Sequence, residues 1–241
     1  NWSNPSEANP LVSTMNTYGA LYEIYPLMIL VSPTGEVIAA NSKDAKGSSI
    51  NSSKIYGRSM ADTAWFKAVS AGQFLTTPGG LTGTTVTDPY YDDTLADVTG
   101  SDGFTVVFAA PVHNNSGQKI GYWANYLDFG MVEQTISQSY TSIANSGFPA
   151  VEIILTDRLG NILVDFNPTE DGYAPDQYSR DSNQVGRVNL KQANDLAISQ
   201  AITTGSFNGA TVNKNGHHQN AGAHRSLGYG GYAGPGWVAS V

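Results

Sequence analysis

A strand–turn–strand unit occurs twice in this chain of 241 residues. The first copy, at 27–41, reads LMILVSPTGEVIAAN, and the second, at 152–166, reads EIILTDRLGNILVDF. In both copies an apolar run leads into a short turn that contains a glycine, Gly35 or Gly160, and a second apolar run follows. An internal repeat constrains a fold more than any single motif does. A repeat of this size predicts two related globular modules in tandem.

The composition is that of a globular protein with few charges and no cysteine. Hydrophobic residues make up 40% of the chain and charged residues 13%, against about 25% charged in a typical domain. The net charge is −8 and Lys and Arg form no cluster, so we expect no nucleic acid as a partner. A sequence without cysteine excludes disulfides and thiolate chemistry, but it does not fix the compartment.

Periodicity predicts helices and antiparallel strands. Apolar residues at helical spacing favour a helix from Asn4 to Tyr22, and Asp62 stands where it would cap a short helix at 63–70. Strands are expected at 27–31, 37–40, 104–112 and 120–127, and a helix from about 132 to 146. The second module repeats the hairpin at 152–166, adds a helix near 190–203 and ends with a strand at 237–241. This order predicts the α+β class with antiparallel sheets.

Two polar segments contain residue types that bind metals, but their spacing does not favour a metal site. Several carboxylates within 88–100 can bind Ca²⁺ in principle, yet the pattern is not that of an EF-hand. We expect a solvated loop there, with one aspartate facing a ligand. His217, His218 and His224 fit no metal template and are expected in a surface loop. The sequence also carries no known catalytic motif, so we expect neither metal, cofactor nor enzymatic activity.

No apolar run reaches the ~18–20 residues that a membrane-spanning helix needs. The chain begins at Asn1 without a visible signal peptide and stops after GWVASV. We therefore expect an excised portion of a longer protein whose flanking segments cross a membrane.

The order and spacing of several short segments resemble the double Cache sensor domain of bacterial chemoreceptors and sensor kinases, over essentially the whole chain. These segments are LVSPTGEVIAAN, YGRSMADTAWFKAVSAG, PYYD, FTVVFAAPV, GQKIGYWANYLDF, ILTDRLGNILVDF and GYAGPGWVASV. The resemblance implies a long N-terminal helix (1–25 here), a membrane-distal PAS-like module with the ligand pocket (26–147) and a membrane-proximal module (148–241). It also implies the extracytoplasmic, periplasmic part of an inner-membrane receptor that is a homodimer at full length.

The resemblance places the pocket on three elements of the first module. In family members that bind α-amino acids, an Arg on the helix element holds the ligand carboxylate, and this position is Thr63 here. The family's Tyr-spacer-Asp element matches Tyr90 and Asp92, which point to one side if the backbone is extended. The Asp that clamps the ammonium group in the family corresponds to Tyr126, and Asp128 follows two residues later.

Both charged anchors for a zwitterion are therefore replaced, and an aromatic enclosure with an acid remains. Its expected members are Trp65, Phe66, Tyr90, Tyr126 and Asp92, with Tyr91, Trp123 and Asp128 as further candidates. Such an enclosure suits a purine-like base by stacking or an amine by cation–π contact. Core packing is the competing interpretation for the aromatic residues, above all for Tyr126 and Trp123.

Three other functions stay open on the sequence. One is a sensor for amino acids or organic acids on a histidine kinase. Another is a secreted β-rich carbohydrate-active enzyme with two carboxylates, drawn from Asp88–Asp97 and Glu133. The third is an adhesin-like structural module. For the isolated chain we expect a monomer or a weak dimer.

Overall fold

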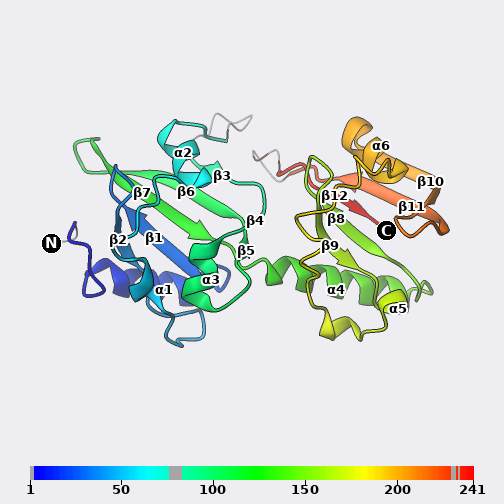
Figure 1. Cartoon of the computed structure of the whole chain (residues 1–241), viewed down its shortest axis with the longest axis horizontal. Helices are drawn as coiled ribbons and strands as arrows, with labels where there is room; N and C mark the ends of the chain where they lie inside the picture. The colour runs from blue at the N-terminus through cyan, green and yellow to red at the C-terminus, as the bar shows by residue number, and fades with distance from the viewer. Residues whose placement is uncertain (1–2, 76–82, 229–231, 233) are drawn as a thin grey trace. The chain divides into compact units, whose positions relative to one another are not determined.

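The chain forms two compact units, 1–129 and 130–241 (Figure 1). The computed structural model describes residues 3–75, 83–228, 232 and 234–241. The division lies one helix earlier than the expected boundary at 147/148. Helix α4 (Gly130–Asn145) accounts for the difference, because it packs on β9 (Ile162–Phe166) and on η2 (Pro175–Gln177) within the second unit.

Unit 1 is built on one antiparallel five-stranded sheet. Its helical elements are α1 (Leu11–Tyr22), η1 (Ser52–Ile55), α2 (Ala64–Ser70) and α3 (Asp93–Thr99). The sheet has the order β2-β1-β7-β6-β3, from Val37–Ala40, Leu27–Val31, Lys119–Tyr126, Val107–His113 and Thr85–Val86. A separate two-stranded ribbon joins β4 (Tyr90–Tyr91) to β5 (Phe104–Thr105).

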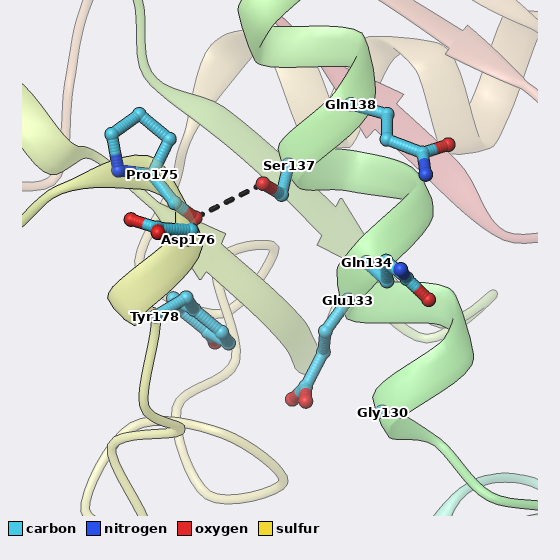
Figure 2. A pocket seen from close by; sticks show the side chains of 8 residues that line it. All are labelled: Gly130, Glu133, Gln134, Ser137, Gln138, Pro175, Asp176 and Tyr178. Atoms are coloured by element: carbon cyan, nitrogen blue, oxygen red, sulfur yellow. Dashed lines mark hydrogen bonds between the residues drawn. The ribbon is translucent and has the colours of Figure 1, made fainter.

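Unit 2 repeats this topology. Besides α4, β9 and η2 it contains β8 (Ile153–Thr156), α5 (Pro168–Asp171), α6 (Leu196–Thr204), β10 (Ser206–Val212), β11 (His218–Arg225) and β12 (Val238–Ser240). The sheet order is β10-β11-β12-β8-β9, so in both units the last strand lies between the first hairpin and the later strands. Figure 2 shows α4 beside η2, where the Ser137 hydroxyl donates to the Pro175 carbonyl over 3.0 Å.

The two hairpin turns are equivalent in detail. Gly35 has φ 89° and Gly160 has φ 94°, a left-handed backbone that glycine adopts without a Cβ penalty. The Gly35 carbonyl accepts from the Met60 amide over 2.7 Å, and the Gly160 carbonyl accepts from the Leu190 amide over 2.8 Å. Each turn is therefore pinned to the segment that follows its hairpin, and the repeat predicted from the sequence is confirmed.

The sheet of unit 1 separates two apolar cores. Strand β1 is buried along its whole length because both of its faces are covered. One face carries Ile29 and packs with α2 and α3, while the other carries Met28 and packs with Val12 and Met15 of α1. Alternation along β7 divides its side chains between the same two cores.

Three segments differ from the sequence-based expectations. The segment 88–100 is not a loop, because it forms β4 and the capped helix α3. The expected histidine-rich loop is largely strand β11, which pairs with β10 over Ser206–His224 and Val212–His218. The N-terminal helix covers Leu11–Tyr22 where a long helix was expected. Among the described residues, no helix is both long enough and apolar enough to span a bilayer.

Candidate functional site

Helix α2 positions two of the expected aromatic residues. Thr63, and not Asp62, is its N-cap: the Thr63 hydroxyl accepts from the Phe66 amide over 3.3 Å and donates to the Met60 carbonyl over 2.7 Å. Asp62 is exposed and lies 3.4 Å from the Lys67 ammonium. The Thr63 hydroxyl is therefore occupied in capping α2. The side chain is also neutral, so it cannot hold a ligand carboxylate by charge.

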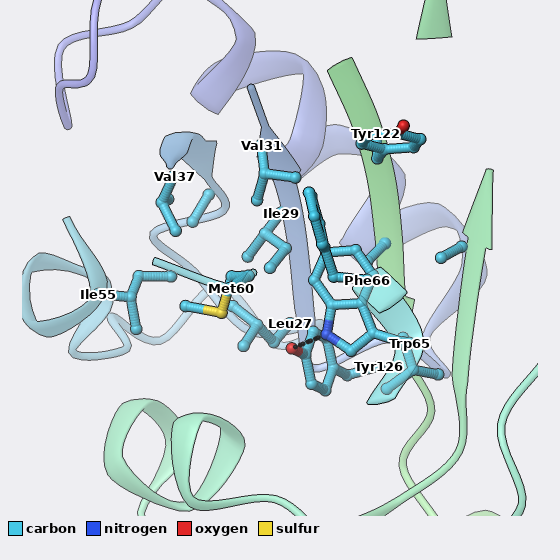
Figure 3. Close-up of a cluster of buried hydrophobic side chains, with 14 of the residues drawn as sticks. Leu27, Ile29, Val31, Val37, Ile55, Met60, Trp65, Phe66, Tyr122 and Tyr126 are labelled. Atoms are coloured by element: carbon cyan, nitrogen blue, oxygen red, sulfur yellow. Dashed lines mark hydrogen bonds between the residues drawn. The ribbon is translucent and has the colours of Figure 1, made fainter. Parts of the chain in front are cut away.

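The centre of the site is a hydrogen bond between two fully buried aromatic side chains (Figure 3). Trp65 and Tyr126 are each 0% exposed, and the Trp65 indole N–H donates to the Tyr126 hydroxyl over 3.0 Å. The hydroxyl's own proton has no acceptor among the described residues. Burial, and next the charge of Asp92, raise the pKa of Tyr126 well above 10.0, so the phenol stays protonated.

Asp92 supplies a buried acid to the same side. Only 5% exposed, it caps α3 by accepting from the Leu95 amide over 2.9 Å, and its second oxygen accepts from the Tyr90 hydroxyl over 2.8 Å. The expected pairing of Tyr90 with Asp92 on one side of the backbone is therefore present. Burial, followed by the Asp92 charge, raises the pKa of Tyr90.

The aromatic wall extends from Trp65 through two further rings. Phe66 meets Trp65 edge-on at 5.8 Å and meets Tyr122 edge-on at 5.2 Å between ring centroids. Sequence reasoning missed Tyr122, although β-strand alternation places it on the same face as Tyr126. Lys119 lies 4.9 Å from the centroid of the Tyr122 ring.

Three of the expected residues do not join this group. Trp123 lies on the opposite face of β7, where it packs with the α1 core and donates to the Asn125 side chain over 2.6 Å. The Tyr91 ring packs on Phe104 at 4.8 Å. Asp128 lies beyond the end of β7 and is exposed.

Unit 1 has no buried cation. None of its Lys and Arg residues is buried: Arg58 is partly exposed, and the exposed lysines are Lys43, Lys46, Lys54, Lys67 and Lys119. Arg58 forms a surface ion pair with Asp97 at 2.8 Å. Asp92 is the one charged residue that is buried in this unit, within the part that the structure describes. The interior of unit 1 is therefore suited to a group that donates N–H bonds and not to a carboxylate.

Unit 2 contains a polar cavity of about 340 Å³ between α4 and η2, drawn in Figure 2. Glu133 lines it and pairs with Arg180 at 2.7 Å, with both side chains largely buried. Of the carboxylates considered for a hydrolase, Glu133 lies in unit 2 and those of Asp88–Asp97 lie in unit 1. No three His, Asp or Glu side chains gather as a metal site among the described residues.

Solved structures with the same fold are sensor domains. One is the ligand-binding domain of the amino-acid chemoreceptor PctC of Pseudomonas aeruginosa PAO1, in complex with GABA. It is 20% identical to this chain in sequence, with a TM-score of 0.54, and the match covers 98% of this chain and 81% of the PctC chain. PctB of the same organism, in complex with L-Arg, is 16% identical with a TM-score of 0.56 and coverages of 98% and 73%.

An extracellular domain assigned to a histidine kinase, vpHK1S-Z8, is 12% identical with a TM-score of 0.60 and coverages of 98% and 74%. No protein-family model and no curated protein sequence matches the chain. At these identities the likeness establishes the fold alone. The fold of this chain is that of a double Cache sensor domain, as its sequence segments predicted.

Proposed function

We propose that this chain is the extracytoplasmic sensor domain of a bacterial transmembrane chemoreceptor and that unit 1 binds a small nitrogen-bearing molecule. The observation that carries the proposal is the single buried acid, Asp92, near Trp65, Tyr90 and Tyr126 in a unit where no described Lys or Arg is buried. In the full-length receptor, flanking membrane helices connect this domain to the cytoplasm and the receptor is a homodimer.

The ligand's nitrogen is recognised by Asp92 and its body by aromatic rings. A carboxylate offers about four acceptor positions, and Asp92 uses one on each oxygen, so it can also accept from a ligand N–H. The Tyr126 hydroxyl proton is available to a ring nitrogen. Stacking on Trp65 or Phe66 favours a planar base, and cation–π contact favours an amine. Tyr90 is half-buried and marks the side from which a ligand enters.

Strand β7 is the element that carries the signal. It holds Tyr126 on the ligand side of the sheet and Trp123 on the side of α1. A ligand that moves Tyr126 therefore also moves the surface on which α1 packs. The energy available is the ligand's differential affinity for the two positions, typically about 1–3 kcal/mol in allosteric proteins.

A second candidate is a sensor for amino acids, including one on a histidine kinase. Two of the similar structures hold GABA and L-Arg, which is the observation in its favour. Against it, Thr63 caps α2 and unit 1 offers no buried cation for a carboxylate.

A thermal-shift screen distinguishes the two candidates. The panel contains purine bases, primary amines, α-amino acids and organic acids, and a ligand at 100-fold above its Kd stabilises the fold by about 2.7 kcal/mol. We expect stabilisation by bases or amines that Asp92→Asn removes. Asparagine remains a good N-cap, so this variant keeps α3. Asp97→Asn is the matched control, because Asp97 is exposed at the other end of α3. Stabilisation by α-amino acids alone would favour the second candidate.

A further inference from the structure

Unit 2 contains a second, smaller cavity with a different chemistry. Its volume is about 220 Å³. It lies among three segments, which are the residues before β8, the β9–α5 junction and the β10–β11 turn. Glu152, Asn167, Glu170, Asn213 and His217 are the lining residues that matter here.

Glu152 is the unusual member of this lining. Its side chain is only 7% exposed, and neither carboxylate oxygen accepts a hydrogen bond from the described residues. The Lys214 ammonium lies 3.2 Å from one oxygen, which is an ion-pair distance. Buried carboxylates in proteins normally accept several hydrogen bonds, and one that does not calls for an unseen partner.

The surrounding charges are unbalanced. Lys214 also donates to Asp165, so one partly buried ammonium is shared by two carboxylates whose side chains are largely buried. Glu170 is the second carboxylate that lines the cavity, where it accepts from the side-chain amides of Asn167 at 2.8 Å and Asn215 at 3.0 Å. Burial raises the pKa of Glu152, with Lys214 opposing the shift. The cavity therefore has an excess of acceptors and negative charge.

An organic cation fits this site better than a metal ion does. The described residues contain no group of three or more His, Asp or Glu placed to ligate a metal. An ammonium group brings three donors that fit separated carboxylates. The volume lies below the ~300–1,000 Å³ of typical ligand pockets, so the molecule has few heavy atoms.

We propose that this cavity of unit 2 binds the ammonium group of a small aliphatic amine or diamine, with Glu152 as its buried acceptor and Glu170 as its second. The site is separate from Asp92 and its aromatic wall in unit 1. The inference does not depend on the function proposed for that unit.

The test is a titration of the whole chain with 1,3-diaminopropane, followed by backbone amide NMR and calorimetry. We expect the amides of Asn213 and His217 to shift, and 1,3-propanediol, which has the same shape without charge, to shift neither. Glu152→Gln should weaken binding at least tenfold. Two controls should leave it unchanged: Glu133→Gln, a buried and paired carboxylate elsewhere in unit 2, and Asp97→Asn, an exposed carboxylate in unit 1.

Glu152→Gln leaves Lys214 paired with Asp165 and removes one of the surplus carboxylates, so we expect it to fold at least as stably as the parent, which its amide spectrum checks. Equal responses to the diamine and the diol would overturn the proposal, as would unchanged binding in Glu152→Gln. Strand β12 lies between β8 and β11 and runs towards the cavity, with Ser240 opposite Ile154. Residues added after Val241 would continue β12 alongside the segment that carries Glu152. Loss of diamine binding in such a lengthened chain would also overturn the proposal. If the diamine shifted only amides of unit 1, it would be a ligand of that unit alone and this site would not exist.

Discussion

The two units differ most in the hydrogen bonds and ion pairs of their buried carboxylates. Asp92 accepts one hydrogen bond on each oxygen and caps a helix, whereas Glu152 accepts none and shares Lys214 with Asp165. A satisfied carboxylate costs little when buried, while one that depends on a single cation is sensitive to pH and to the loss of that cation. The residues therefore predict different responses to mutation.

Glu152 should make the folded state less stable as the pH rises. Burial, chiefly, raises its pKa in the folded state above the ordinary 4.5, with Lys214 opposing the shift and Asp165 and Glu170 adding to it. The folded protein then holds the proton more tightly than the unfolded chain. The contribution to stability is fully present below pH 4.5 and is lost as the pH rises through the folded value. Urea unfolding from pH 4 to 8 should show this loss in the parent and a smaller one in Glu152→Gln. Parallel pH profiles would contradict it.

Lys214→Met should destabilise unit 2 strongly. It leaves Glu152 and Asp165 buried without their shared cation, and breaking a buried ion pair in this way costs about 3–5 kcal/mol. Lys67→Met is the control, because the Lys67 pair with Asp62 is exposed and such pairs contribute at most about 1 kcal/mol. Denaturant unfolding measures both variants. Similar losses for the two would show that Lys214 is not the cation on which the cluster depends.

At the scale of elements, the hairpin turn is the feature that the repeat specifies most tightly. Gly35→Ala adds a Cβ 2.7 Å from the Ala61 backbone nitrogen, on top of the unfavourable positive φ. Gly47 also has a positive φ, but its added Cβ meets nothing within 4 Å. Gly35→Ala should therefore cost about 1–3 kcal/mol more than Gly47→Ala in the free energy of unfolding. Equal costs would mean that the contact with Ala61 relaxes freely.

Elements with local apolar patterns could be predicted from the sequence, and elements that depend on distant partners could not. Both hairpins follow from apolar runs around a glycine. Helix α3 was expected to be a loop, since only Leu95 and Val98 are buried among polar neighbours. Strand β11 has a Gly, Asn and His composition, and its pairing with β10 and β12 specifies it as a strand.

The same division holds for the candidate site. Tyr90 and Asp92 could be placed together because alternation along an extended segment is a local rule. That rule also separates Trp123 from Tyr126, as the structure has it. The contact of Trp65 with Tyr126 joins residues 61 positions apart, and the charge surplus around Glu152 joins three segments. Sequence spacing carries no information about either.

At the scale of the whole molecule, the isolated chain should be a monomer or a weak dimer. The exposed large apolar side chains of α1 are Tyr18, Leu21 and Tyr22. Three side chains cannot supply the ~1,200–2,000 Å² that a stable interface buries. Sedimentation velocity at low micromolar concentration should therefore give a monomer of 25.5 kDa. A tight dimer at that concentration would mean that a larger surface of the chain associates.

The two units share a topology but not an interior: unit 1 encloses an acid among aromatic rings, and unit 2 encloses carboxylates around one lysine. Under the proposed function, nitrogen recognition belongs to unit 1, at Asp92 and the Trp65 wall. Losing the Asp92 bond to a ligand cation should cost about 1.5–3 kcal/mol of binding free energy. Losing the Trp65 ring should cost about 1–3 kcal/mol of binding free energy if the ring stacks on a base.

Calorimetric titration measures these losses of binding free energy most directly. It compares the parent chain with three variants, each first shown to be folded: Asp92→Asn, Asp97→Asn and Trp65→Ala. With a purine base or primary amine from the thermal-shift screen, we predict Kd values weakened about 10- to 150-fold by Asp92→Asn, weakened by Trp65→Ala, and unchanged by Asp97→Asn. Unchanged affinity in both Asp92→Asn and Trp65→Ala, or micromolar binding of simple α-amino acids to the parent chain, would contradict the account.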